Sequence, residues 1–153
     1  MLELVTKNEL GIEVDDIELR KTSVSYSLET VKLIKENTVF DSIVFIMGMD
    51  SFNSITNWFH WEELFSICSF LVLGRSGATV NTAVSDKIQL KKRITNDVSE
   101  FFQKPAGRVL MAGKFNIDLS STLVREMLNT NESLENCLNR EVFEYINDKK
   151  LYR

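Results

Sequence analysis

An uninterrupted apolar segment, Ser42–Gly48 (SIVFIMG), is the feature that most restricts the fold of this chain. It is apolar at consecutive positions, which is typical of a strand covered on both faces by helices in a parallel sheet. Phe70–Leu73 (FLVL) repeats this character, and Arg108–Ala112 (RVLMA) predicts another strand. A helix predicted at Trp61–Phe65 separates the first two strands. We therefore expect a right-handed βαβ unit within an α/β fold that has a mostly parallel sheet.

The remaining segments divide between helical and strand patterns. Ser27 is expected to cap a helix that runs from Leu28 to about Glu36. Thr82–Gln103 is interpreted as one long amphipathic helix that ends before Pro105. Its predicted buried face consists of Ile88, Ile94, Val98, Phe101 and Phe102.

Two short helices are predicted near the C-terminus, over Ser121–Leu128 and Arg140–Lys149. Near the other end, Ile12–Leu19 (IEVDDIEL) alternates β-branched and acidic residues and predicts a strand. No repeat, linker or shift in composition divides the sequence. We therefore expect a single domain over residues 1–153.

Charge and segment length exclude several classes of protein. The formal net charge of −4 leaves no broad basic surface for nucleic acid or anionic membranes, although a small basic cluster can still serve a nucleotide. No apolar run approaches the roughly 18 residues that suggest a membrane span. The N-terminus carries acidic Glu3 and no signal-peptide pattern, and Cys68 and Cys137 fit no metal motif. These features predict a soluble cytoplasmic protein with two buried free thiols.

Three consecutive hydroxyl residues, Ser120, Ser121 and Thr122, open one of the predicted helices, and Arg125 follows about one turn later. Free backbone N–H groups and the positive end of the helix dipole meet the hydroxyls there, which suits a phosphate. The alternative is an ordinary helix cap followed by a surface arginine. Three hydroxyls are more than a cap needs, so both interpretations stay open.

Two further groups follow the first strand. Gly48 and Asp50 stand where ligands bind in open α/β sheets, although the same residues also suit a turn and helix cap. Residues 58–61 (WFHW) hold three large aromatics, which are usually core but could also stack on a planar ring. His60, the only histidine, is interpreted as an exposed helix residue. Gly107–Phe115 resembles a P-loop but lacks the correct spacing and the Ser or Thr that binds Mg²⁺, so we reject it.

Taken in order, four segments resemble the bacterial nicotinate-nucleotide adenylyltransferases. They are GMDSFNSITNWFHWEEL, FLVLGRSG, FNIDLSSTLVREML and VFEYINDKKLYR. The resemblance covers essentially the whole chain and implies a Rossmann-like nucleotidyltransferase fold. It also implies adenylyl transfer from ATP to nicotinate mononucleotide in NAD biosynthesis.

The resemblance implies roles for particular residues. Ser120, Ser121, Thr122 and Arg125 would hold the ATP phosphates, which Mg²⁺ would bridge, and Gly48 and Asp50 would lie against adenosine. The nicotinate ring would contact Trp58 and Phe59, helped by Ser27 and Arg75. Ser27 stands where family members often have Thr, which keeps the hydroxyl. Both sets of residues would have to reach the same pair of nucleotides.

The chain departs from the family at its N-terminus. It has no Gly-Gly-Thr-Phe-Asp-Pro loop and no His-x-Gly-His motif, so the resemblance supplies no catalytic residue. Its first ten residues resemble the end of an internal helix, which implies an N-terminally truncated fold that lacks a first βαβ unit of roughly 30 residues or more. The missing strand would lie beside Ile43–Met47, so we expect an exposed apolar strand edge that aggregates unless another chain, such as a second copy in a homo-oligomer, covers it.

Three functional interpretations stay open at this point. Met1 is either an internal methionine of a longer adenylyltransferase or the natural start of a non-catalytic nucleotide-binding or interaction module. Phosphopantetheine adenylyltransferase shares the Ser-Ser-Thr-x-x-Arg motif and is the third interpretation. The Gly-x-Asp-Ser and Trp-Phe arrangement favours the nicotinate enzyme.

Overall fold

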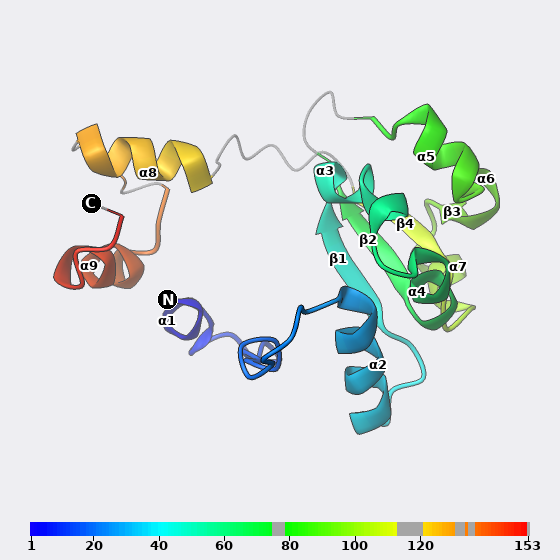
Figure 1. The fold of residues 1–153 in the computed structure, drawn as a ribbon, viewed down its shortest axis with the longest axis horizontal. Coiled ribbons are helices and arrows are strands. Elements are labelled where there is room, and N and C mark those ends of the chain that lie inside the picture. Colours follow the sequence, from blue (N-terminus) through cyan, green and yellow to red (C-terminus); the bar gives the residue numbers. More distant parts are fainter. Residues whose placement is uncertain (75–78, 113–120, 131–133, 135–136, 153) are drawn as a thin grey trace. The chain divides into compact units, whose positions relative to one another are not determined.

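The chain folds around a four-stranded parallel sheet in the order β1-β2-β4-β3 (Figure 1). The computed structural model describes residues 1–74, 79–112, 121–130, 134 and 137–152. These fall into two compact units, one of residues 17–117 and one of residues 1–16 with 118–153. We call them the sheet unit and the helical unit and describe each by itself. The expectation of a single domain over 1–153 stays a prediction.

The sheet unit confirms the predicted α/β class and its parallel sheet. Its strands are β1 (Val44–Gly48), β2 (Ser69–Leu73), β3 (Ile94–Thr95) and β4 (Val109–Ala112). Its longer helices are α2 (Ser27–Asn37), α4 (Trp61–Ile67), α5 (Thr82–Lys87) and α7 (Val98–Phe102), and its shorter ones are α3 (Met49–Phe52), η1 (Ile55–Asn57) and α6 (Leu90–Arg93). The predicted helix at Ser27 begins one residue early, because Tyr26 takes the cap position.

The core of this unit is centred on β2. Phe70 and Val72 are fully buried, and the ring of Phe70 lies 4.4 Å from that of Phe65 and 6.5 Å from that of Phe52, measured between centroids. Each such aromatic removes a large apolar area from water, which is the main favourable contribution to folding. The apolar segments found in the sequence therefore mark the true centre of the sheet.

The first strand, β1, is less covered than its composition suggests. Met47 is buried, whereas 60% of Ile46 is exposed. The expectation that helices cover both faces of this strand is therefore wrong. Among the described strands β1 pairs only with β2. The expected position of β1 at an edge of the described sheet is confirmed, whereas the exposure of that edge stays a prediction. Its tendency to aggregate stays a prediction.

The long helix predicted at Thr82–Gln103 is wrong. Gln89 adopts a left-handed conformation with φ of 52°, which separates α5 from α6. Residues 94–95 then form β3 and pair with the start of β4. Of the expected buried face, Ile88 and Phe101 are buried, whereas Ile94, Val98 and Phe102 are exposed. Pairing with β4 has outweighed the helical pattern.

The strand predicted at Ile12–Leu19 is also wrong. This segment forms no helix or strand, and three of its apolar side chains, Ile12, Val14 and Leu19, are exposed, with Leu19 at 87%. A strand needs a neighbouring strand to satisfy its backbone groups, and none of the described strands lies beside this segment. Its four acidic residues also oppose burial.

The helical unit contains α1 (Leu2–Thr6), α8 (Ser121–Thr130) and α9 (Arg140–Asp148), which confirms both predicted C-terminal helices. Among the described residues, its buried core comprises Leu128, Leu134, Val142 and Ile146. Lys7 Nζ contacts Glu141 Oε2 at 2.6 Å and links the end of α1 to α9. In the described part of the chain, no helix has the length and apolarity to span a membrane.

Candidate functional site

A pocket in the sheet unit brings together three residues that the family resemblance assigned to one ligand. Ser27, Trp58 and Phe59 all line it, with a volume of about 250 Å³. The other lining residues are Ser25, Tyr26, Leu28 and Asn57. We call this the aromatic pocket. Residues about thirty positions apart in the sequence therefore share one cavity, which the sequence alone could not establish.

The surrounding core fixes the position of Trp58. Its ring meets the edge of Phe45 with centroids 5.9 Å apart, and its indole Nε1 donates to Ser54 Oγ at 3.4 Å. The residue follows η1, whose Ile55 is fully buried. A ring held on one side by the core and open to a pocket on another is suited to stack on a planar ligand.

Phe59 occupies a more exposed position, with 44% of its surface accessible. Its ring stacks on Tyr26 with a centroid distance of 4.3 Å and an interplanar angle of 25°. The sequence analysis gave no role to Tyr26 or to Asn57, which also line the pocket. Their adjacency to Ser27 and Trp58 was the available signal.

Gly48 and Asp50 lie at the carboxyl edge of the sheet, as expected. Gly48 ends β1 and is paired with Leu73, which in turn is paired with Ala112, so the ends of three strands are aligned there. A Cβ added at Gly48 would meet no atom within 4 Å. The backbone is thus open to a ligand at this point, and Asp50 is exposed in the first turn of α3.

In the helical unit, Ser121, Thr122 and Arg125 are exposed on α8, a ten-residue helix that begins at Ser121. Ser121 and Arg125 line a cavity of about 330 Å³ with Val142 and Tyr152 among its walls. The Arg125 guanidinium carbon lies 5.7 Å from the centroid of the Tyr152 ring. The spacing of four residues places serine and arginine on one face of the helix.

Two assigned residues, Ser120 and Arg75, lie outside the described residues. The other phosphate residues belong to the helical unit and the pyridine residues to the sheet unit. The expectation that both sets reach the same pair of nucleotides stays a prediction.

The thiols and the histidine offer no chemistry of their own. Cys68 is fully buried, and burial raises the pKa of its thiol to about 12, so it is a poor nucleophile at neutral pH. Cys137 is half-buried and also free, so only one of the two predicted buried thiols is fully enclosed. His60 is exposed, as expected. It was also expected to lie in a helix, but it immediately precedes α4 and has a φ of 48°.

Comparisons with known proteins identify relatives along the whole chain. No family model matches it. A probable nicotinate-nucleotide adenylyltransferase of Shewanella pealeana is 33% identical over 156 residues, which cover 100% of this chain and 70% of the relative. Proteins with the same description from Shewanella woodyi and Clostridium acetobutylicum are 32% and 27% identical, and the matches cover 73% and 70% of their lengths.

Proposed function

This chain belongs to the nicotinate-nucleotide adenylyltransferase family, and we propose that it serves adenylyl transfer from ATP to nicotinate mononucleotide in the cytoplasm. The relatives support the general activity by their descriptions. The observation that carries the finer assignment is the aromatic pocket, because it groups Ser27 with Trp58 and Phe59. A hydroxyl beside two large rings suits a planar, polar pyridine.

The proposed reaction needs no covalent intermediate. A phosphate oxygen of nicotinate mononucleotide attacks the α-phosphorus of ATP and forms a new P–O bond. The bond from that phosphorus to the oxygen that bridges to the β-phosphate breaks, and pyrophosphate leaves. Positioning of the two nucleotides and stabilisation of phosphate charge supply the catalysis.

We assign the phosphates of ATP to Ser120, Ser121, Thr122 and Arg125. The described members are exposed on a single helix, and arginine donors pair well with phosphate oxygens. Gly48 and Asp50 are assigned to adenosine, and Arg75 to the pyridine nucleotide. Mg²⁺ is proposed to arrive with ATP and to be held by phosphate oxygens, which are its preferred type of ligand.

Substitution of Trp58 tests the pyridine assignment. Loss of a stacking ring costs about 1–3 kcal/mol per base, so Trp58→Ala should weaken nicotinate mononucleotide at least about fivefold while ATP affinity changes little. Isothermal titration calorimetry measures both. Equal losses for the two ligands would refute the stacking role.

Two further variants separate binding from folding. Phe59→Ala removes a ring that is half exposed and should weaken the same ligand without loss of the folded state. Trp61→Ala removes the chain's other tryptophan, which packs on Phe65 and does not line the pocket, so mononucleotide affinity should be retained.

The DNA upstream of Met1 separates the enzyme from a non-catalytic module. An in-frame Gly-Gly-Thr-Phe-Asp-Pro and His-x-Gly-His would support the enzyme, because the family uses these groups on the phosphates. A stop codon immediately before Met1 would support a nucleotide-binding module.

A further inference from the structure

A second pocket in the sheet unit is lined by four cations. Lys92, Arg93, Lys104 and Arg108 surround a volume of about 260 Å³, together with Gln89, Ala106 and Gly107. None of the seven lining residues is acidic. In a chain of net charge −4, such a concentration of positive charge is not expected from composition. We call this the cationic pocket.

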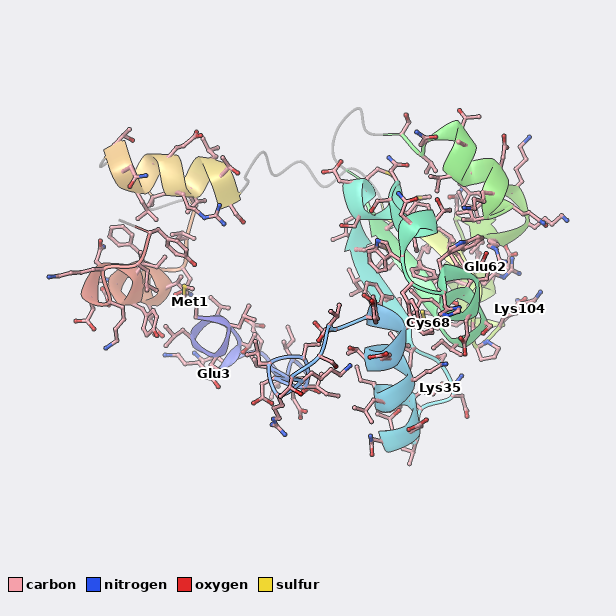
Figure 2. The ribbon with its side chains drawn as sticks, viewed as in Figure 1. Met1, Glu3, Lys35, Glu62, Cys68 and Lys104 are labelled. Carbon is pink, nitrogen blue, oxygen red and sulfur yellow. The ribbon has the colours of Figure 1, made fainter. Side chains whose placement is uncertain are left out.

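The cationic pocket lies at the amino edge of the sheet, opposite the edge where ligands of α/β proteins usually bind. Arg93 immediately precedes β3 and Arg108 immediately precedes β4, and the first residues of these strands, Ile94 and Val109, are paired. Gly107 N donates to Cys68 O at 3.0 Å, and Cys68 directly precedes β2. Figure 2 labels Lys104 and Cys68 in this unit. Five residues of β2 separate the two edges by roughly 13 Å.

The two arginines are held in place by the protein, as expected for a built site. Arg93 Nε donates to Ile88 O at 2.8 Å and its Nη1 to Gly107 O at 3.2 Å, while its guanidinium carbon lies 4.8 Å from the centroid of the Phe65 ring. Partial burial lowers the pKa of Arg93. Two fixed backbone contacts orient the rest of the guanidinium before any ligand arrives.

Arg108 is more enclosed, with only 15% of its side chain exposed. Its Nη2 contacts Glu100 Oε1 at 2.9 Å, but its buried Nε–H has no acceptor among the described residues. A buried donor without a partner is unfavourable. The enclosed guanidinium places a fixed positive charge at the wall of the pocket.

Few of the cations that line the pocket form ion pairs in the described part of the chain. Glu100 is the only carboxylate paired with a lining residue in the described part of the chain, and Thr95 Oγ1 also donates to it at 2.7 Å. Lys92 Nζ donates to the neutral Gln89 side chain at 2.9 Å. Among the described residues, one of the four cations, Arg108, is thus paired with a carboxylate.

Gly107 leaves space beside the arginine. Its φ of +82° disfavours other residues, and an added Cβ would lie 3.1 Å from Arg93 Nη1 and 3.2 Å from Phe65 O. A side chain here would displace the guanidinium.

We propose that the cationic pocket is a second anion-binding site, for a small phosphate or polyphosphate ion. Arginine forks and lysine ammonium groups are the side chains that bind phosphate oxygens. Inorganic diphosphate, a compact polyanion, suits a pocket of about 260 Å³ with four cations in its lining. The site uses no residue assigned above to adenylyl transfer.

Titration with pyrophosphate, followed by ¹H–¹⁵N NMR on the full chain, tests this proposal. The amide signals of Gly107 and Arg108 should shift with saturation, and the shift should persist in Arg125→Ala, which alters the proposed ATP site. Shifts confined to the region of Arg125, or loss of the Gly107 shift in that variant, would overturn the proposal.

A lysine pair and its matched control complete the test. The double variant Lys92→Gln, Lys104→Gln removes two exposed cations and should lower the affinity for pyrophosphate at least tenfold. The control Lys91→Gln changes a lysine on the same helix as Lys92 but outside the pocket, and should leave that affinity unchanged. Equal affinity in the double variant and the wild type would contradict the site. Equal shifts with chloride at matched ionic strength would also contradict it, because general screening would then explain them.

Discussion

The aromatic pocket and the face of α8 that carries Ser121 and Arg125 differ in how the protein positions the side chains proposed to bind a ligand. Trp58 is packed against the aromatic core of the sheet unit, through Phe45. Arg125 is exposed on a helix of the helical unit, in which four of the described residues form the buried core. Core contacts fix the geometry of the first group, whereas helix spacing and a contact with the Tyr152 ring fix that of the second. The difference predicts which substitutions disturb the fold and which disturb only binding.

The largest effect should follow from Phe70→Ala in the sheet unit. The substitution leaves a cavity among three rings, and such changes cost about 3–5 kcal/mol. Hydrogen exchange resolved by segment should show faster exchange in β1, β2 and β4. In the helical unit, Val142→Ala removes less volume and should cost roughly 1–2.5 kcal/mol, read from exchange in α8 and α9. Equal costs would mean that the two cores do not differ as described.

A smaller effect, on binding alone, is expected for Arg125→Ala. Loss of a hydrogen bond to a charged phosphate should weaken ATP by about 1.5–3 kcal/mol while the stability of the exposed helix changes little. Calorimetry with ATP measures the loss. Arg140→Ala is the matched control, because Arg140 is 90% exposed and pairs with Glu144, four residues along α9. If both variants bind ATP like the wild type, Arg125 is an ordinary surface residue.

The smallest effect on folding is expected for Gly48→Ala. Its φ of −77° suits any residue and its Cβ position is open, so the free energy of unfolding should stay the same or rise by about 0.4–1 kcal/mol. ATP affinity should fall, because a methyl group would block approach to the backbone. Chemical denaturation and calorimetry measure the two quantities. Gly107→Ala should instead destabilise the fold, since that position is crowded and has positive φ. Unchanged ATP affinity in Gly48→Ala would remove this glycine from the site.

Elements with a strong apolar signal were predicted well from the sequence. The three long strands, the helix at Trp61 and both C-terminal helices occur as expected. The apolar pattern that drives their burial lies within consecutive residues, so it can be recognised in the sequence. The failures involve segments whose partners are distant in the sequence. Residues 94–95 became a strand only because the start of β4 lies beside them. Ile12–Leu19 remained irregular because none of the described strands pairs with it.

The candidate site also has a part that the sequence predicted and a part that depends on distant contacts. Residue type and order were sufficient to nominate Ser27, Trp58 and Phe59, but no local rule placed Tyr26 and Asn57 beside them. That grouping depends on where α2 and η1 pack, which is a property of the whole core.

The sequence by itself determined the α/β class, the parallel sheet and the family, because apolar runs and motif order are encoded in consecutive residues. Only the tertiary structure decided that four cations from α6, the end of α7 and the start of β4 surround one pocket. Their positions span seventeen residues of sequence with no common motif. Strand pairing brings them together, since the register of β3 and β4 places Arg93 and Arg108 at the same edge.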